Sequence, residues 1–138
     1  MDINRSLVVK TNVLISIKPK YVDEILNEKK KFEYRKSIFK REIDKIYIYS
    51  TSPEQKIVGY FVYTGYYKET PEIIWQNTKK YSGIDEESYY KYFYKRPYAY
   101  AIKIEQINAF RKPIDPQKAF QNFLPPQSYI YLEGDLIE

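Results

Sequence analysis

The 138-residue sequence contains no cysteine and no histidine. Without cysteine there is no disulfide framework, no thiolate zinc site and no cysteine nucleophile. Without histidine, the most common general base and the most common transition-metal ligand are both missing. Any catalysis must therefore use lysine, carboxylate, tyrosine or hydroxyl groups, and we expect no cofactor. The remaining metal option is a magnesium site made of carboxylates alone.

Long apolar runs are also missing. The longest contains about five residues, whereas a membrane-spanning helix needs about 20. The chain does not open with a signal-peptide pattern. We therefore expect a soluble, cytoplasmic protein without a membrane partner. A chain of this length is long enough for one domain with one hydrophobic core.

The sequence is rich in basic and aromatic residues. Lysine and arginine outnumber aspartate and glutamate by 23 to 18, which gives a net charge of +5, and there are 17 tyrosines. A positive charge suits a polyanionic partner, and tyrosine rings can stack on bases as well as pack on sheets. Most of these rings must be structural. The aromatic residues that we consider for stacking on single-stranded bases are Tyr66, Tyr67, Trp75 and Tyr90.

Hydrophobic periodicity predicts five to six strands and two to three helices. Apolar runs or alternation predict strands at 13–17, 28–36, 45–49, 57–63, 98–104 and 128–132. Helical spacing and start signals predict helices at 18–27, 70–80 and 85–94. The fold class is therefore α+β, and the strand count suits a small, mostly antiparallel barrel. We expect a loosely ordered N-terminus at 1–12, a single domain at 13–132 and an acidic tail at 133–138.

Two local details follow from the same patterns. Asn27 is the residue that we expect to adopt a left-handed conformation where the first helix turns into the next strand. In the helix at 85–94, we expect Tyr89, Tyr92 and Phe93 to be buried.

The segment 28–36 carries the most informative pattern. Alternation places Phe32 and Tyr34 on one face of a strand and Glu33 and Arg35 on the other. The acid and the guanidinium are then roughly 7 Å apart along one face, and a lysine cluster that includes Lys30 precedes them. Two interpretations stay open: a ligand held between these charges, or a solvated ion pair that contributes at most about 1 kcal/mol.

The order Lys30, Glu33, Arg35 resembles the signature G-x-K-x-x-E-x-R of the ASCH domain, a branch of the PUA-like superfold, with Glu28 in place of the glycine. Residues 14–19, 100–104 and 125–129 are similar to one subgroup, whose members are described as predicted transcriptional regulators. The similarity covers 13–132. It implies a PUA-like barrel with a cleft beside the first helix and the second strand, and roles in RNA binding and RNA metabolism.

The leading hypothesis is a cleft that binds RNA or a nucleotide-like ligand, with a regulatory role in RNA metabolism. Lys30, Glu33 and Arg35 would line it, because a planar guanidinium suits a phosphate or a base edge and lysines attract phosphates. Further basic and hydroxyl residues would form the rim of this cleft: Lys18, Lys20, Lys36, Arg41, Ser50 and Ser52.

An enzyme is the second hypothesis, because some proteins of the family that this chain resembles are hydrolases. One branch deacetylates acetylated cytidine with a lysine and a threonine, and others are described as ribonucleases. Lys30 matches that lysine, but Glu33 occupies the position of the threonine, so the deacetylase activity is not carried over. In a metal-independent amidohydrolase or ribonuclease, Lys30 would act as a base or an electrostatic stabiliser and Glu33 as an acid or a base, provided that burial shifts their pKa values toward neutrality. Deep burial of Glu33 beside a pocket would favour this hypothesis, and a shallow groove would favour binding.

The third hypothesis is a protein-interaction module that uses exposed tyrosines. An aromatic patch far from Arg35 would point to it.

Overall fold

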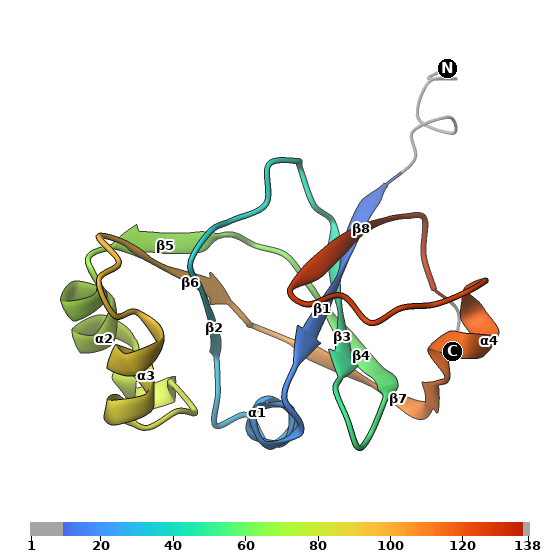
Figure 1. The fold of residues 1–138 in the computed structure, drawn as a ribbon, viewed down its shortest axis with the longest axis horizontal. Helices are drawn as coiled ribbons and strands as arrows, with labels where there is room; N and C mark the ends of the chain where they lie inside the picture. The colour runs from blue at the N-terminus through green and yellow to red at the C-terminus, as the bar shows by residue number, and fades with distance from the viewer. Residues whose placement is uncertain (1–9, 137–138) are drawn as a thin grey trace.

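The computed structural model describes residues 10–136 and contains two β-sheets (Figure 1). The larger sheet has the strand order β7-β4-β3-β1-β8. Its strands are, in chain order, β1 (Thr11–Ile17), β3 (Lys45–Ser50), β4 (Lys56–Val62), β7 (Ile107–Ile114) and β8 (Tyr129–Glu133). The smaller sheet has the order β2-β6-β5. It contains β2 (Phe32–Arg35), β5 (Tyr66–Glu69) and β6 (Ala99–Lys103).

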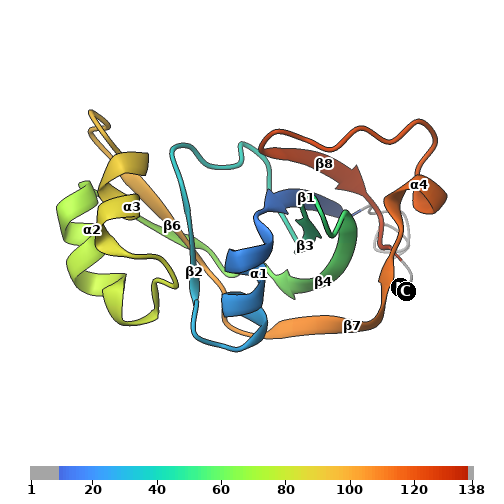
Figure 2. The ribbon, with the colours of Figure 1, turned by 60° about the horizontal axis from the view of Figure 1, so that its bottom comes forward.

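Four α-helices connect these strands within the described range. They are α1 (Pro19–Leu26), α2 (Pro71–Thr78), α3 (Glu86–Tyr92) and α4 (Pro116–Ala119), and a 3₁₀ turn (Lys79–Tyr81) follows α2. Helix α1 lies between β2 and the larger sheet, whereas α2 and α3 lie together beside the smaller sheet (Figures 1 and 2). None of the helices described for this chain combines the length and the hydropathy that a bilayer-crossing segment needs.

The predicted α+β class is confirmed, and the architecture is richer than predicted. The described residues form eight strands and four α-helices, and they do not close into a barrel. Strand β5 escaped prediction because all four of its residues are exposed, so it has no buried alternation. Strand β7 contains Pro113 and was not predicted as a separate strand. It is an edge strand, where a missing backbone N–H is tolerated.

The strands β1 and β3 form the centre of the core. They pair in parallel, and all other strand pairs are antiparallel. Val13 and Ile15 pack on one side with residues of α1, whereas Leu14 packs on the other side with Tyr47 and Phe123. Because both faces of these strands are covered, they read in the sequence as nearly continuous apolar runs.

The end of α1 corrects one prediction. Asn27 has an ordinary φ of −88°, and the next residue, Glu28, has a φ of 60°. Glu28 stands where the ASCH signature has glycine, the residue that adopts this left-handed conformation without a steric penalty. This chain therefore forms with a glutamate the same left-handed turn for which the signature has glycine.

Helices α2 and α3 pack their aromatic residues against β2 and β6. The side chains of Thr70 and Asp85 cap the two helices. Tyr89 and Phe93 are buried as predicted. Tyr92 is not: it is 37% exposed, because α3 ends at this residue and turns its ring toward the edge of β2.

The predicted domain boundaries stay a prediction. The expected N-terminal segment 1–12 lies mostly outside the described residues, although Thr11 and Asn12 already belong to β1. Of the expected acidic tail, Glu133 is the last residue of β8, and residues 137–138 lie outside the described range.

Candidate functional site

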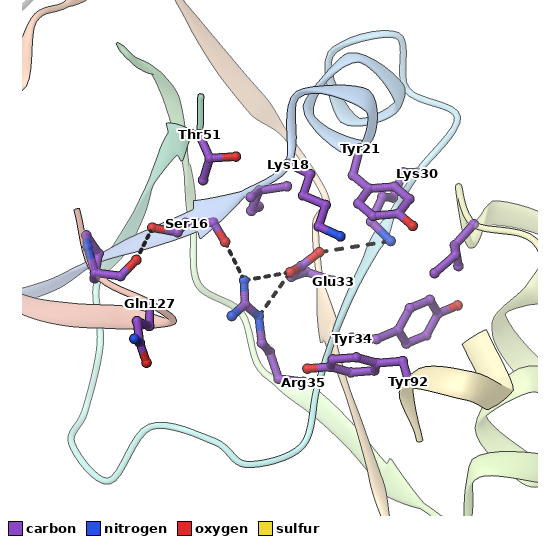
Figure 3. Close-up of a pocket in the computed structure, with 13 residues that line it drawn as sticks. Ser16, Lys18, Tyr21, Lys30, Glu33, Tyr34, Arg35, Thr51, Tyr92 and Gln127 are labelled. Carbon is purple, nitrogen blue, oxygen red and sulfur yellow. Dashed lines mark hydrogen bonds and ion pairs between the residues drawn. The ribbon is translucent and has the colours of Figure 1, made fainter. Parts of the chain in front are cut away.

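A cavity of about 510 Å³ lies between the two sheets. Figure 3 shows that its side chains come from β1, β2, the start of α1, the end of α3 and the segment that precedes β8. The residues that line it are Ser16, Ile17, Lys18, Tyr21, Lys30, Glu33, Tyr34, Arg35, Thr51, Ile84, Tyr92, Pro126 and Gln127.

Glu33 and Arg35 form a buried ion pair on one face of β2. The Nε and Nη2 atoms of Arg35 lie 3.0 and 2.9 Å from Oε2 of Glu33. The side chains of Glu33 and Arg35 are only 10% and 15% exposed. The interpretation of this pair as a solvated surface contact is therefore wrong.

Arg35 also connects the two sheets. Its Nη2 donates to the backbone oxygen of Ser16 in β1 at 2.8 Å, and its Nη1 donates to Oγ of Ser128 at 3.0 Å. The hydroxyl of Ser16 in turn donates to the backbone oxygen of Pro126 at 2.7 Å. The guanidinium is therefore fixed in one orientation, since three of its five N–H groups are in hydrogen bonds.

Lys30 is the most deeply buried charged residue in the cavity, with a side chain that is 3% exposed. Its ammonium group donates to the backbone oxygen of Ser82 at 2.7 Å and lies 4.0 Å from Oε1 of Glu33. It also lies 4.7 Å from the centre of the Tyr34 ring. Burial lowers the pKa of Lys30 to about 8, although the charge of Glu33 acts in the opposite direction.

The turn after the 3₁₀ segment closes over Lys30. Gly83 in this turn has a φ of +63°, which favours glycine. A Cβ atom at this position would also lie 2.8 Å from Cγ of Lys30 and closer still to its Cβ. Glycine is therefore required here for two reasons, and the turn holds the lysine side chain in place.

Aromatic residues form the walls of the cavity beside Lys30. The hydroxyl of Tyr34 lies 2.7 Å from Oγ1 of Thr78, which donates to the backbone oxygen of Ile74 at 2.6 Å. The Tyr34 hydroxyl is therefore the donor to Thr78. Burial raises the pKa of Tyr34 to about 12, so it stays protonated at neutral pH. Partial desolvation also raises the pKa of Tyr92, although this residue is 37% exposed.

The cavity contains four of the nine residues predicted from the sequence: Lys18, Lys30, Glu33 and Arg35. The other five lie outside its lining. Three of these are cations beside aromatic rings: Lys20 at 4.9 Å from the Tyr21 ring centre, Lys36 at 4.5 Å from that of Tyr92, and Arg41 at 4.3 Å from that of Tyr131.

The two predicted serines lie on either side of the residue that lines the cavity. Ser50 is buried in β3, and Ser52 is exposed in the turn that follows. Thr51, between them, faces the cavity. Because β1 and β3 are parallel, their carboxyl ends meet at one edge of the sheet. Parallel pairing would have pointed to both Ser16 and Thr51, but no pattern in the sequence indicates that these two strands pair.

The other lining residues that sequence reasoning missed come from distant segments. Tyr34 was placed on the face of the strand opposite Glu33 and Arg35, and Tyr92 was expected to be buried. Among the residues considered for stacking, Trp75 is 6% exposed and Tyr90 is half-buried, and both pack against Tyr89. Tyr66 and Tyr67 are 42% and 51% exposed.

The described residues include no cluster of three or more carboxylate, histidine or cysteine side chains that could hold a metal ion. Within the cavity, a single carboxylate lies between two cations. Such a set of side chains is a poor magnesium site, because magnesium prefers several oxygen ligands.

Comparisons with known proteins bear on the fold. No family model matches the chain. The chain is 27% identical over 129 residues to the ATP synthase subunit alpha of Ureaplasma parvum. The aligned residues make up 93% of this chain but only 16% of that protein. The chain is also 25% identical over 129 residues to the ASCH domain-containing ribonuclease of Zymomonas mobilis, in an alignment that covers 91% of this chain and 87% of that protein.

Solved structures of the ASCH protein from Zymomonas mobilis superpose with a TM-score of 0.80. The unmutated protein is 26% identical and covers 88% of this chain and 87% of its own, and a point mutant is 24% identical, covering 88% of this chain and 89% of its own. These relatives do not test the predicted subgroup of transcriptional regulators. They do establish the architecture: the chain has the fold of the ASCH domain, a PUA-like fold, as its signature residues predicted.

Proposed function

We propose that the cavity binds single-stranded RNA and cleaves its phosphodiester backbone without a metal ion. The observation that carries this proposal is the buried ammonium of Lys30 beside Glu33 and Arg35. The cavity volume of about 510 Å³ is within the range of small-molecule sites. The similarity to a relative named as an ASCH domain-containing ribonuclease, along 91% of this chain, supports the same function.

Burial favours an enzyme over a site that only binds. Glu33 as a whole residue is 8% exposed and borders the cavity. Deep burial of Glu33 beside a pocket is the arrangement expected of an enzyme, whereas a shallow groove is expected of a protein that only binds RNA. Phosphate recognition alone is served by exposed, fully charged lysines. Lys30 instead has a pKa of about 8, because burial disfavours its charge. Groups that titrate this close to neutral pH are suited to proton transfer.

Cleavage would proceed by attack of the ribose 2′-oxygen on the adjacent phosphorus. Glu33 accepts the proton of the 2′-hydroxyl through Oε1, which lies 4.0 Å from Lys30 and beyond hydrogen-bond distance from it. The bond between O2′ and phosphorus forms, and the bond between phosphorus and O5′ breaks. Lys30 donates a proton to the departing O5′. The products are a 2′,3′-cyclic phosphate and a 5′-hydroxyl end.

Arg35 would stabilise the charge that develops on the non-bridging phosphate oxygens. Its contacts with Glu33, Ser16 and Ser128 engage Nε, Nη2 and one N–H of Nη1, which leaves the second N–H of Nη1 for a phosphate oxygen. Donors that are oriented before the reaction stabilise charge in the transition state without reorganisation. Turnover of RNA at this site would be the role in RNA metabolism that the family resemblance implies.

The test is cleavage of a labelled single-stranded RNA, with and without EDTA. We expect cleavage that EDTA does not change and that Lys30→Met lowers at least about 100-fold, as is typical for loss of a general acid. Lys20→Met is the matched control, because Lys20 is an exposed lysine outside the cavity. The rate should also fall as the pH rises through about 8, since Lys30 then loses its proton.

Other outcomes would change the assignment. If the wild-type protein binds RNA but does not cleave it, the function is RNA binding alone. If Lys30→Met cleaves as fast as the wild type, the proposed chemistry is wrong. Acetylated cytidine belongs in the same assays, and its hydrolysis in place of RNA cleavage would assign the amidohydrolase alternative.

A further inference from the structure

The smaller sheet carries a row of side chains that begins in the cavity. In the strand register, Arg35 of β2 lies opposite Tyr100 of β6, and Tyr100 lies opposite Lys68 of β5. Residues paired in this way lie on the same face of a sheet. Helices α2 and α3 pack on the other face, where Tyr34 contacts Tyr89 with ring centres 5.0 Å apart (Figure 1). The row therefore leads from the cavity to the open edge of the sheet at β5.

Exposed aromatic rings surround this row. Tyr66 and Tyr98 are 42% and 49% exposed, and the ring centre of Tyr66 lies 5.7 Å from that of Tyr100. The ammonium of Lys68 lies 4.6 Å from the ring centre of Tyr98 and 5.6 Å from that of Tyr100. These four residues, which we call the tyrosine track, combine three rings with one cation.

The chemistry of the tyrosine track suits single-stranded nucleic acid. Every base has a flat face that can stack on an aromatic ring, whatever the sequence, and an ammonium group neutralises a phosphate. An interaction surface for a protein would not need to adjoin the cavity. Here the track continues directly from Arg35, and the whole chain carries a net charge of +5, opposite to that of a phosphate backbone.

We propose that the tyrosine track is a second subsite for single-stranded RNA, which holds nucleotides next to the one in the cavity. This inference rests on the proposed function. Because neighbouring strands lie about 4.8 Å apart, the row from Arg35 to Lys68 spans about 10 Å. A longer RNA would therefore contact both the cavity and the track, whereas a dinucleotide placed in the cavity would not depend on the track.

The test compares the affinities of a uridine dinucleotide and a uridine octanucleotide, both 2′-O-methylated so that they are not cleaved through the 2′-oxygen. The variants are Tyr66→Ala and Lys68→Ala. Tyr67→Ala is the matched control, because Tyr67 belongs to the same strand and is 51% exposed. It lies on the opposite face, with its ring centre 6.2 Å from that of Phe32. Thermal unfolding of each variant verifies the fold.

We expect Tyr66→Ala to weaken binding of the octanucleotide about fivefold or more, as for the loss of one stacked base. Lys68→Ala should reduce the slope of log affinity against log salt by about 0.7, the contribution of one phosphate contact with a single strand. Dinucleotide affinity should stay at the wild-type value in both variants. Tyr67→Ala should bind both oligonucleotides as the wild type does.

The outcomes separate this inference from the proposed function. If the wild type binds the octanucleotide and Tyr66→Ala binds it equally well, the tyrosine track is not a subsite, although the cavity remains one. If Tyr67→Ala loses as much affinity as Tyr66→Ala, the RNA does not follow the track. If the wild type binds neither oligonucleotide and also fails to cleave unmodified RNA, the proposed function itself is wrong.

Discussion

Two contacts between lysine and a carboxylate show how strongly burial decides the chemistry of this protein. Lys45 lies 3.1 Å from Asp135, with side chains 20% and 48% exposed. Lys30 lies 4.0 Å from Glu33, with side chains 3% and 10% exposed. Desolvation lowers the pKa of Lys45, but its hydrogen bond to Asp135 and nearby charges raise the pKa overall. For Lys30, desolvation prevails and the pKa falls to about 8.

The comparison teaches that a nearby carboxylate does not by itself keep a lysine protonated. In the more exposed pair, water still solvates part of the charge and the carboxylate adds to this stabilisation. In the cavity, the loss of water outweighs the attraction of Glu33. The first contact is therefore an ordinary ion pair, and the second contains a lysine whose pKa is lowered by burial, as the proposed proton transfer requires.

The largest expected effect follows from removing the guanidinium of the buried cluster. Arg35→Met leaves Glu33 buried without its closest partner and breaks the links to Ser16 and Ser128. We expect the free energy of unfolding to fall by about 3–5 kcal/mol. Lys45→Met, in the surface pair, should cost about 1 kcal/mol or less. Urea denaturation measures both, and equal losses in the two variants would contradict the distinction.

Crowding of the buried lysine should come next. Gly83→Ala forces a side chain against Lys30 and places alanine at a φ of +63°. We expect a loss of about 2–4 kcal/mol in unfolding free energy, together with a loss of RNA cleavage. Gly134→Ala is the control, because Gly134 has a φ of +79° but a methyl group added there would meet nothing within 4 Å. It should lose only about 1 kcal/mol, and a similar loss for both would show that Lys30 is free to move.

The pH dependence of stability should distinguish the two lysines. The folded pKa of Lys30 is about 8, below its usual 10.5. Between these values the unfolded chain binds more protons, so unfolding free energy rises with pH. Relative to Lys30→Met, the wild type should therefore gain about 2 kcal/mol between pH 7 and 9.5.

Lys45 should show no such gain. Its folded pKa is raised, so its contribution is complete below its unfolded pKa and is lost only as the pH rises through the folded value. The difference between the wild type and Lys45→Met should therefore stay constant from pH 7 to 9.5. Chemical denaturation at several pH values measures both differences, and a flat profile for Lys30→Met would mean that Lys30 is better solvated than its burial indicates.

The smallest effect concerns the turn that leads into the buried cluster. Glu28→Gly removes a side chain from a residue with a φ of 60°. Glycine relieves the left-handed strain but loses more entropy on folding, so we expect a gain of about 0.5–1 kcal/mol. RNA cleavage should not change, because Glu28 is exposed and outside the cavity. If urea denaturation shows a lower free energy of unfolding for Glu28→Gly than for the wild type, the Glu28 side chain makes a stabilising contact.

The sequence predicted those parts of the site that lie within one local pattern. Alternation placed Glu33 and Arg35 on one face of a strand, and the family signature added Lys30. Ser16, Tyr92 and Gln127 join them in the cavity from β1, α3 and the segment before β8. Sequence spacing gives no information on contacts between segments so far apart, so these residues could not be predicted.

The fold was predictable where the elements have a buried face. The apolar strands β1 and β3 and the amphipathic helix α1 were recognised because their periodicity reflects burial. Strand β5 has no buried residue, so its sequence lacks the alternation that would reveal its pairing with β6. The left-handed conformation was predicted at Asn27 but occurs at Glu28, the next residue. The prediction relied on the general preference of asparagine for this conformation, whereas the position of the turn is determined by the path of the chain from α1 to β2.

The attachment of Arg35 to both sheets has a consequence for how anions would be selected. Its orientation is set by Glu33, Ser16 and Ser128 before any ligand arrives, so little conformational entropy is lost on binding. Because Glu33 already neutralises much of the charge, a simple monovalent anion gains little there. A polymer that also contacts groups beside Arg35 gains binding free energy from each of these contacts. Such preorganisation discriminates by the length and valence of the ligand rather than by attraction at a single point.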